Sequence, residues 1–128
     1  MIKTATQPLA SRESEEAAVT KAVIRAADRL AVTQATLAAI LGVSAPTISR
    51  MANGNLTLQR SSKEFELAVL FVQLYRSLDA VVGGDDTVSQ EWIQNFNTAL
   101  KERPITLIKT VPGLVNVIQY LDARRAIV

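Results

Sequence analysis

The sequence predicts an all-α protein, and three observations support this prediction. Alanine, leucine and valine dominate the composition while aromatic residues make up only 5%, a mixture that favours packed helices over a sheet. Apolar residues recur at helical spacing through most of the chain. Residues 64–82 contain neither glycine nor proline. With 128 residues, 48% of them hydrophobic, the chain can bury the core of one ordinary domain or of two very small ones.

The first helix is expected after a flexible N-terminal tail of residues 1–13. Ser14 can cap it, and Glu15 and Glu16 suit the positive end of a helix dipole. Five apolar residues then follow helical spacing: Val19, Val23, Ala26, Ala27 and Leu30.

Residues 34–51 read as two short helices joined by a glycine turn. Thr33 can cap the first helix, and Gly42 can take the left-handed conformation that ends it. Ser44 can cap the second helix, and Pro46 is tolerated in its first turn. Ala38 leaves room where the two helices cross. The apolar positions that would close this unit are Leu37, Leu41, Val43, Ile48 and Met51, and 53–55 reads as a turn.

The second of these helices would present short polar side chains and one arginine, which suits a helix in the major groove of DNA. Arg50 could bond a guanine bidentately or contact a phosphate, and both readings stay open. Gln34 would lie at a helix N-terminus, where the phosphate backbone is expected, or be an ordinary surface residue. An ordinary helical hairpin that binds nothing is the alternative. The predicted DNA-contacting residues are Gln34, Ser44, Ala45, Pro46, Thr47, Ser49 and Arg50.

The charge distribution supports a polyanionic partner only weakly. The net charge is +2, but no acidic residue lies between Arg29 and Lys63, while Arg50 and Arg60 add positive charge there. Arg60 and Lys63 are expected to contact the DNA backbone or to be solvated charges. A single copy should bind DNA poorly, so we expect a homodimer on an inverted repeat, with half-sites about one helical turn apart.

A second long helix is expected to begin near Ser61 or Ser62 and to run to Val82. It is apolar over so much of its surface that it must be buried on more than one side, as the centre of the fold or as a dimer interface. Gly83 and Gly84 would end this helix.

Three further helices are expected in the remaining chain. Asp85 or Asp86 would cap a helix that carries Trp92, Ile93, Phe96 and Leu100. Arg103-Pro104 would begin a short helix, and residues 110–113 a capped restart with Pro112 in its first turn. Trp92 is expected to be a core residue rather than a contact to a partner.

Several functional classes are excluded or disfavoured. Without cysteine or histidine, the chain lacks disulfides, thiolate and imidazole catalysis, and the usual zinc ligands. No carboxylate pair lies on a recognisable catalytic scaffold, so no catalytic residue, metal site or cofactor is predicted and an enzyme is not expected. No apolar run approaches the roughly 20 residues that span a bilayer, and the N-terminus lacks a signal-peptide core, so a cytoplasmic location is expected.

The C-terminal part resembles the toxin-binding domain of the Xre/MbcA/ParS antitoxins, over about residues 64–128. The spacing from tryptophan through proline to a Thr-x-x-Gly step carries the likeness, at Trp92, Asn97, Leu100, Arg103, Pro104, Leu107, Thr110, Gly113, Val117 and Leu121. Lys101-Glu102 departs from it, because a glycine is common there, and Ala123–Val128 lacks the usual late glycine. The two short helices before it resemble the Xre-type helix-turn-helix domain of the same proteins.

The resemblance implies an antitoxin of a bacterial type II toxin–antitoxin pair. Its partner would be a RES-domain toxin, which consumes NAD⁺; the C-terminal domain would cover the toxin's active site and the N-terminal domain would repress the shared promoter. The expected division is a tail (1–13), a helix-turn-helix domain (14–63), a connecting or dimerisation helix (64–82) and a toxin-binding domain (83–128). The expected toxin-contacting residues are Arg103, Pro104, Leu107, Thr110, Gly113, Val117, Leu121, Arg124 and Arg125.

Two alternatives remain open at this stage. Arg124 and Arg125 could enter a cleft built for a phosphate-rich dinucleotide, or could simply be solvated at the negative end of a helix dipole. The chain could also be a stand-alone dimeric helix-turn-helix repressor whose C-terminal half only dimerises or binds a small ligand.

Overall fold

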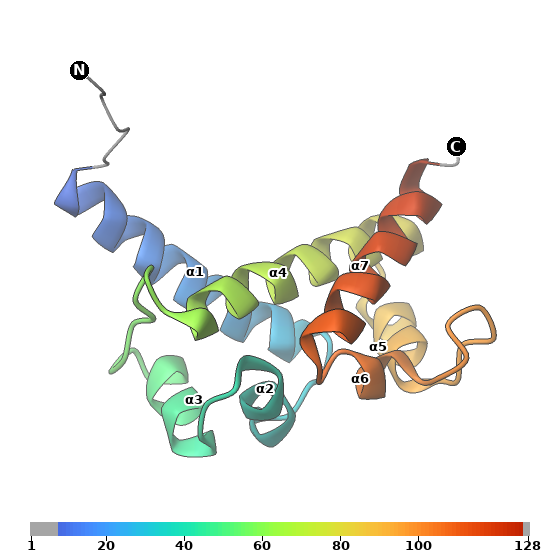
Figure 1. Ribbon diagram of the computed structural model, residues 1–128, viewed down its shortest axis with the longest axis horizontal. Coiled ribbons are helices and arrows are strands. Elements are labelled where there is room, and N and C mark those ends of the chain that lie inside the picture. Colours follow the sequence, from blue (N-terminus) through green and yellow to red (C-terminus); the bar gives the residue numbers. More distant parts are fainter. Residues whose placement is uncertain (1–7, 127–128) are drawn as a thin grey trace.

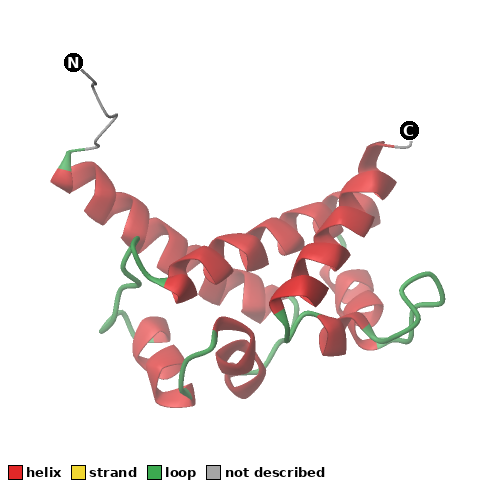
Figure 2. Cartoon of the chain, viewed as in Figure 1, coloured by secondary structure: helices red, strands yellow, loops and turns green. Residues whose placement is uncertain are grey.

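The computed structural model describes residues 8–126. Within them it has seven helices and no β-strand (Figures 1 and 2), which confirms the all-α prediction. The helices are α1 (Leu9–Arg29), α2 (Gln34–Leu41), α3 (Ala45–Ala52), α4 (Lys63–Val82), α5 (Asp86–Gln94), α6 (Pro104–Leu107) and α7 (Val111–Ala126). None of these helices alone is long and apolar enough to cross a membrane.

Helix α4 is the centre of the fold. It packs most extensively against α7 and α1, and it also contacts α2 and α5. Phe71, Leu74 and Leu78 of α4 are completely buried. In Figure 1, α1, α4 and α7 form an open V, with α2 and α3 below α1 and α4, and with α5 and α6 below α7. The helix is therefore the centre of the fold, which is one of the two roles that the sequence left open, and it keeps Val69 exposed.

Capping side chains begin most helices where the sequence predicted. The Thr33, Ser44 and Ser62 hydroxyls accept hydrogen bonds from backbone N–H groups in the first turns of α2, α3 and α4. The Asp85 carboxylate accepts from the N–H groups of Thr87 and Val88, at 3.0 and 3.2 Å, so it is a helix cap. No cluster of three or more potential metal ligands occurs among the described residues.

The predicted start of the first helix is wrong. Ser14 lies inside α1, which begins at Leu9 after Pro8, so residues 9–13 are helical and not part of a tail. Proline can precede a helix because it has no N–H group to satisfy, and Ala10, Arg12 and Glu13 are compatible with helix. The rest of the predicted tail lies outside the described residues.

The predicted end of the fifth helix is also wrong. Helix α5 ends at Gln94, since Asn95 has an extended conformation with ψ of 151°, so neither Phe96 nor Leu100 is helical. Residues 95–103 instead form a loop, closed by an isolated antiparallel bridge between Asn97 and Glu102. This loop projects beyond α5 and α6 in Figure 2.

Replacing Lys101 with glycine should stabilise the protein by about 1 kcal/mol, because Lys101 has a φ of 62° and side chains disfavour this left-handed conformation. The Lys101 N–H donates to the Asn97 carbonyl at 2.7 Å, and glycine would keep this bond. Urea unfolding of Lys101→Gly measures the gain, with Lys101→Ala as the control that should show none. A destabilised glycine variant would contradict the assignment of strain to Lys101.

Candidate nucleic-acid interface and partner-binding module

Helices α2 and α3 form a tightly closed pair. Gly42 ends α2 with a φ of 74°, and the Ala38 carbonyl accepts from the N–H groups of both Gly42 and Val43, at 2.8 and 3.0 Å. The two helix axes differ in direction by 108°, within the roughly 90–120° range of DNA-binding helix pairs. The buried side chains that hold the pair together include Leu37, Leu41, Ile48 and Met51, as the sequence predicted, whereas the predicted Val43 is only partly buried. Ala38 is buried as well.

The predicted DNA-contacting residues all lie at the surface. Thr47 and Ser49 are half-buried, and the remaining five, Gln34, Ser44, Ala45, Pro46 and Arg50, are exposed. The Ser44 hydroxyl caps α3 by accepting from the Thr47 N–H, and it also forms a hydrogen bond with Thr47 Oγ1 at 2.9 Å. Arg50 Nη2 lies 3.5 Å from Thr47 Oγ1. The surface is therefore small, rigid and polar, with a single guanidinium available to bind an anion.

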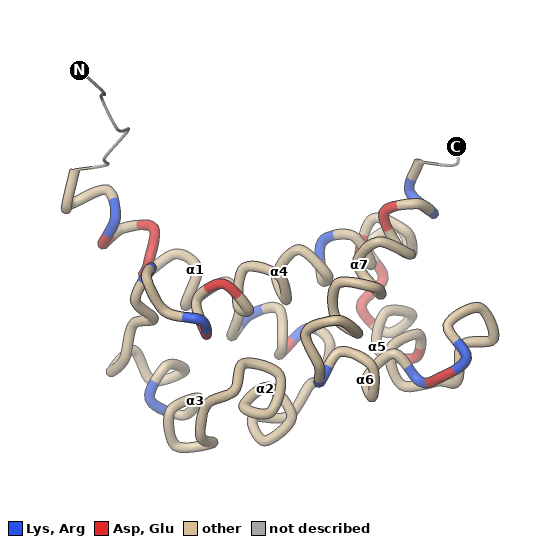
Figure 3. Tube along the Cα trace, viewed as in Figure 1, with Lys and Arg blue, Asp and Glu red and all other residues tan. Residues whose placement is uncertain are grey.

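The positive charge around this surface is smaller than the sequence suggested. Arg60 Nη1 lies 3.0 Å from Glu15 Oε1, and the Arg60 backbone N–H donates to Glu16 Oε2 at 2.7 Å, so the exposed Arg60 guanidinium is partly neutralised by an ion pair. Arg29 Nη1 lies 4.0 Å from Asp86 Oδ2. The acidic partners lie on α1 and α5, outside the segment between Arg29 and Lys63 that has no acidic residue. The sequence of that segment alone therefore overstated the positive charge at this surface. Helices α2 and α3 carry one charged residue, Arg50 (Figure 3).

Contacts at the end of α1 link the DNA-facing half to the C-terminal half. Gln90 Nε2 of α5 donates to the Arg29 carbonyl at 2.9 Å. The Arg29 guanidinium lies 3.5 Å from the Tyr75 hydroxyl, and this hydrogen bond is the main cause that raises the pKa of Arg29, with a smaller effect from Asp86. The two halves therefore pack as one body through α1, α4 and α5.

Three of the residues expected to contact a toxin are core residues. Pro104, Val117 and Leu121 are buried, the last two completely. The apolar face of α7 packs against α4, so a partner cannot reach it without unfolding the helix pair. The expectation of direct contact is wrong for these three residues.

Thr110 and Gly113 build the sharp corner between α6 and α7. The Gly113 N–H donates to Thr110 Oγ1 at 3.1 Å, which is the predicted capped restart of the helix. A Cβ atom on Gly113 would overlap the Leu107 carbonyl oxygen and lie 2.8 Å from its carbonyl carbon. The Thr-x-x-Gly step is thus required by the packing of the corner. Part of the corner remains accessible to a partner, because Thr110 is exposed and Leu107 is half-buried.

The predicted arginines of the last helix are exposed and held in place. Arg124 Nη1 donates to the Tyr120 hydroxyl at 2.9 Å, and its guanidinium lies 5.7 Å from the centre of the Tyr120 ring. Arg125 Nη1 donates to Ser77 Oγ at 3.2 Å and lies 3.8 Å from Asp122 Oδ1. Half-buried Trp92 stacks on Tyr120 with a centroid distance of 6.4 Å, so Trp92 lies at the edge of the core and not deep within it.

The sequence interpretation missed the exposure of Phe96. This side chain is 62% exposed in the loop after α5. Phe96 follows Trp92 by four residues, which is a helical spacing. This spacing led to the prediction that both side chains lie on one buried helix face. The signals against a longer helix were Asn95, Asn97 and Thr98, which are weak helix formers.

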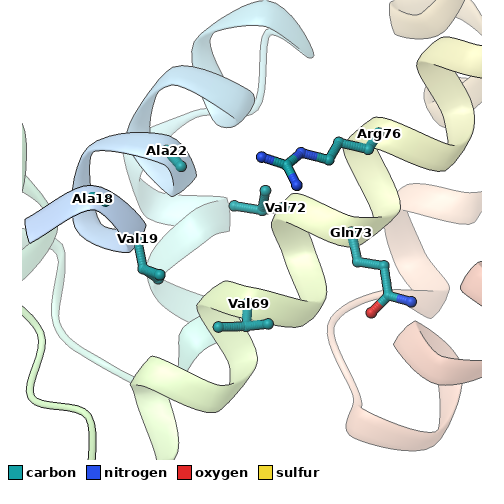
Figure 4. A pocket seen from close by; sticks show the side chains of 7 residues that line it. All are labelled: Ala18, Val19, Ala22, Val69, Val72, Gln73 and Arg76. Atoms are coloured by element: carbon teal, nitrogen blue, oxygen red, sulfur yellow. The ribbon is translucent and has the colours of Figure 1, made fainter. Parts of the chain in front are cut away.

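A groove of about 380 Å³ runs between α1 and α4 (Figure 4). Its charged lining residue is Arg76, and no carboxylate lines it, so it lacks the paired acid and base that hydrolytic chemistry needs. The other lining residues are Ala18, Val19, Ala22, Val69, Val72 and Gln73.

These features define an all-helical protein in which a helix-turn-helix pair and a second helical module share the central helix α4. The chain matches the model of the antitoxin Xre-like helix-turn-helix domain over residues 10–73. It matches that of the antitoxin Xre/MbcA/ParS C-terminal toxin-binding domain over residues 77–126. The chain therefore belongs to the Xre/MbcA/ParS antitoxins, regulatory proteins of toxin–antitoxin systems with a toxin and DNA as partners. A search of curated proteins found no significant match.

Proposed function

We propose that this antitoxin neutralises a RES-domain toxin that degrades NAD⁺, by covering the toxin's active site, and that it represses their shared operon. The observation that carries the proposal is the direct packing of a DNA-binding module and a toxin-binding module on one helix, α4. The choice of a RES-domain partner rests on the resemblance of the C-terminal sequence to the antitoxins of such toxins. Operator binding requires access to the chromosome, so the proposed location is the cytoplasm.

Repression is proposed to require a homodimer on an inverted repeat. One copy offers a single guanidinium, Arg50, from the whole α2–α3 pair. Affinity for DNA depends strongly on the number of phosphates that a protein neutralises, so one copy is a weak binder. Two copies on two half-sites would double these contacts and supply the missing affinity.

Exposed arginines support inhibition by occlusion. A toxin that consumes NAD⁺ needs a cleft that receives a dinucleotide with two phosphates. Arg124 and Arg125 lie in the last turn of α7, exposed and oriented by Tyr120 and by Ser77. Guanidinium groups make charge-assisted hydrogen bonds with carboxylates, so acidic side chains at such a cleft would bind them. The arginines would thereby block it without taking part in chemistry.

Expression of the neighbouring open reading frame, with and without this chain, tests the proposal. We expect the neighbour alone to arrest growth and deplete cellular NAD⁺, and co-expression of this chain to prevent both. A toxic neighbour that leaves NAD⁺ unchanged would retain the antitoxin function and reject the RES assignment. A harmless neighbour would favour a stand-alone dimeric repressor.

A further inference from the structure

Phe96 is exposed in a way that folding does not explain. The other two phenylalanines, Phe65 and Phe71, are buried, whereas Phe96 is 62% exposed. Isolated apolar residues are common on protein surfaces, so exposure alone carries little weight. The construction of the loop that holds Phe96 is the second observation.

The loop at 95–103 is fixed at both ends by strong hydrogen bonds. Arg103 Nε donates to the Gln94 carbonyl at 2.6 Å, and Arg103 Nη2 donates to Gln94 Oε1 at 2.7 Å, which ties the start of α6 to the end of α5. Directly inside this clamp, the Asn97 N–H donates to the Glu102 carbonyl at 3.0 Å. Phe96 thus lies between two cross-links and has little freedom of backbone movement.

The tip of the loop is fixed as well. Asn97 Oδ1 accepts from the Leu100 N–H at 3.0 Å, and the Asn97 carbonyl accepts from the Lys101 N–H at 2.7 Å. These bonds hold Lys101 in its left-handed conformation, which side chains disfavour. A rigid loop that retains a strained residue and an exposed aromatic ring is preorganised, and preorganisation lowers the entropy lost on binding.

We propose that loop 95–103 is a docking element for the toxin and that Phe96 is its anchor, inserting into an apolar pocket of the toxin bordered by carboxylates. This inference rests on the proposed function, because it takes the toxin as the partner of the C-terminal module. Aromatic anchors that fill a partner's pocket dominate the energetics of many interfaces. The charge of the loop supports an acidic border, because exposed Lys101 and Arg103 flank Glu102 (Figure 3), whose Oε1 accepts from the Arg103 N–H at 2.9 Å.

Arg103 has a positioning role in this arrangement. Two of its guanidinium nitrogens bond Gln94, so it fixes the loop. The same surface includes residues of the family pattern, Asn97, Leu100 and Arg103, whose contacts maintain the loop. The residues of the family pattern therefore hold the loop in shape, and the loop presents Phe96 to the partner.

The test compares Phe96→Ala with Val88→Ala, a control at another exposed apolar residue of the same module, 42% exposed on α5. Binding is measured by calorimetry against the protein encoded by the neighbouring gene, purified in inactivated form. We expect Phe96→Ala to weaken binding about 30-fold or more and Val88→Ala to leave it within about 3-fold, as for an anchor and a peripheral contact. Phe96→Leu should retain much of the affinity.

Three results are decisive. Wild-type affinity of Phe96→Ala would overturn the proposal, as would an equal loss in both alanine variants. Absence of binding by the wild-type chain would reject the proposed function, and the anchor with it. The first two results reject only the anchor, so the two failures can be told apart. Thermal unfolding and operator binding of Phe96→Ala should match wild type, because the ring lies largely in solvent and far along the chain from α3.

Discussion

Gly113→Ala is expected to destabilise the protein by about 3 kcal/mol, a large fraction of the stability of a small domain. The sign of this prediction is informative. Gly113 lies in α7, and in an unobstructed helix alanine is more favourable than glycine by about 1 kcal/mol. Here the added Cβ atom would overlap the Leu107 carbonyl oxygen and lie 2.8 Å from Thr110 Oγ1. The obstacle is mainly backbone, so it cannot be relieved by a change of rotamer.

Two paths of relaxation are open, and both are unfavourable. If α7 moves away from the corner, it disturbs its contact with α4, the most extensive helix contact in the structure. If residues 107–110 move instead, the bond from the Gly113 N–H to Thr110 Oγ1 is strained and buried Ile108 is displaced. The expected cost is therefore at the upper end of the range for overpacked sites.

Thermal and urea unfolding measure the Gly113→Ala effect, with a decrease in Tm of about 10 °C expected. Asn116→Ala is the matched control, because Asn116 is exposed on the same helix and its replacement should leave stability unchanged or slightly higher. Increased stability of Gly113→Ala would show that the corner can open enough to remove the overlap with Leu107. Loss of toxin binding by this variant alone would not assign Gly113 to the interface, because the corner itself would be disturbed.

The sequence predicted most strongly those features that depend on a few neighbouring residues. The caps at Thr33, Ser44 and Asp85 and the left-handed stop at Gly42 were all anticipated. Each requires one side chain or one backbone conformation and a hydrogen bond to an N–H two or three residues away, or to a carbonyl in the preceding turn. Such signals are complete within a short stretch of sequence.

The errors come from contacts between distant residues. The spacing of Trp92 and Phe96 is helical, but the structure ends α5 at Gln94, whose carbonyl and side chain bond Arg103 nine residues later. The ion pair of Arg60 with Glu15 joins residues 45 positions apart, so the charge pattern of one segment could not reveal it. Both errors follow from interpreting a segment without its partners.

The apolar face of α7 shows the same limitation for the site. Val117 and Leu121 have the spacing of a helix face that must be covered, but spacing does not state whether the chain or its partner covers it. The structure shows that α4 covers it. The proposed contacts with a toxin are therefore limited to exposed groups around this framework: Phe96 in the loop, the accessible part of the corner, and the arginines of α7.

Arg50→Ala is expected to weaken operator binding by about 10- to 100-fold while leaving toxin binding unchanged, because a bidentate guanine contact contributes roughly 1–3 kcal/mol of discrimination. Arg50 is the only charged residue of α2 and α3, so no neighbouring cation on these helices can replace it. Its guanidinium makes a long hydrogen bond to Thr47 Oγ1, at 3.5 Å, so its removal disturbs little of the fold. Electrophoretic mobility shift and calorimetry against the toxin measure the two activities, and exposed Lys109→Ala, outside α2 and α3, controls for lost charge in operator binding.

The salt dependence of binding decides what Arg50 contacts. If it reads a guanine, Arg50→Lys should fail to restore affinity, and the loss should be confined to the native operator, because lysine lacks the fork of donors that fits two acceptors on one base. If it contacts a phosphate, Arg50→Lys should restore most of the affinity, and Arg50→Ala should lower the salt slope by about one unit per bound copy on any sequence. Parallel loss of operator and toxin binding by Arg50→Ala would indicate misfolding and remove Arg50 from the proposed interface.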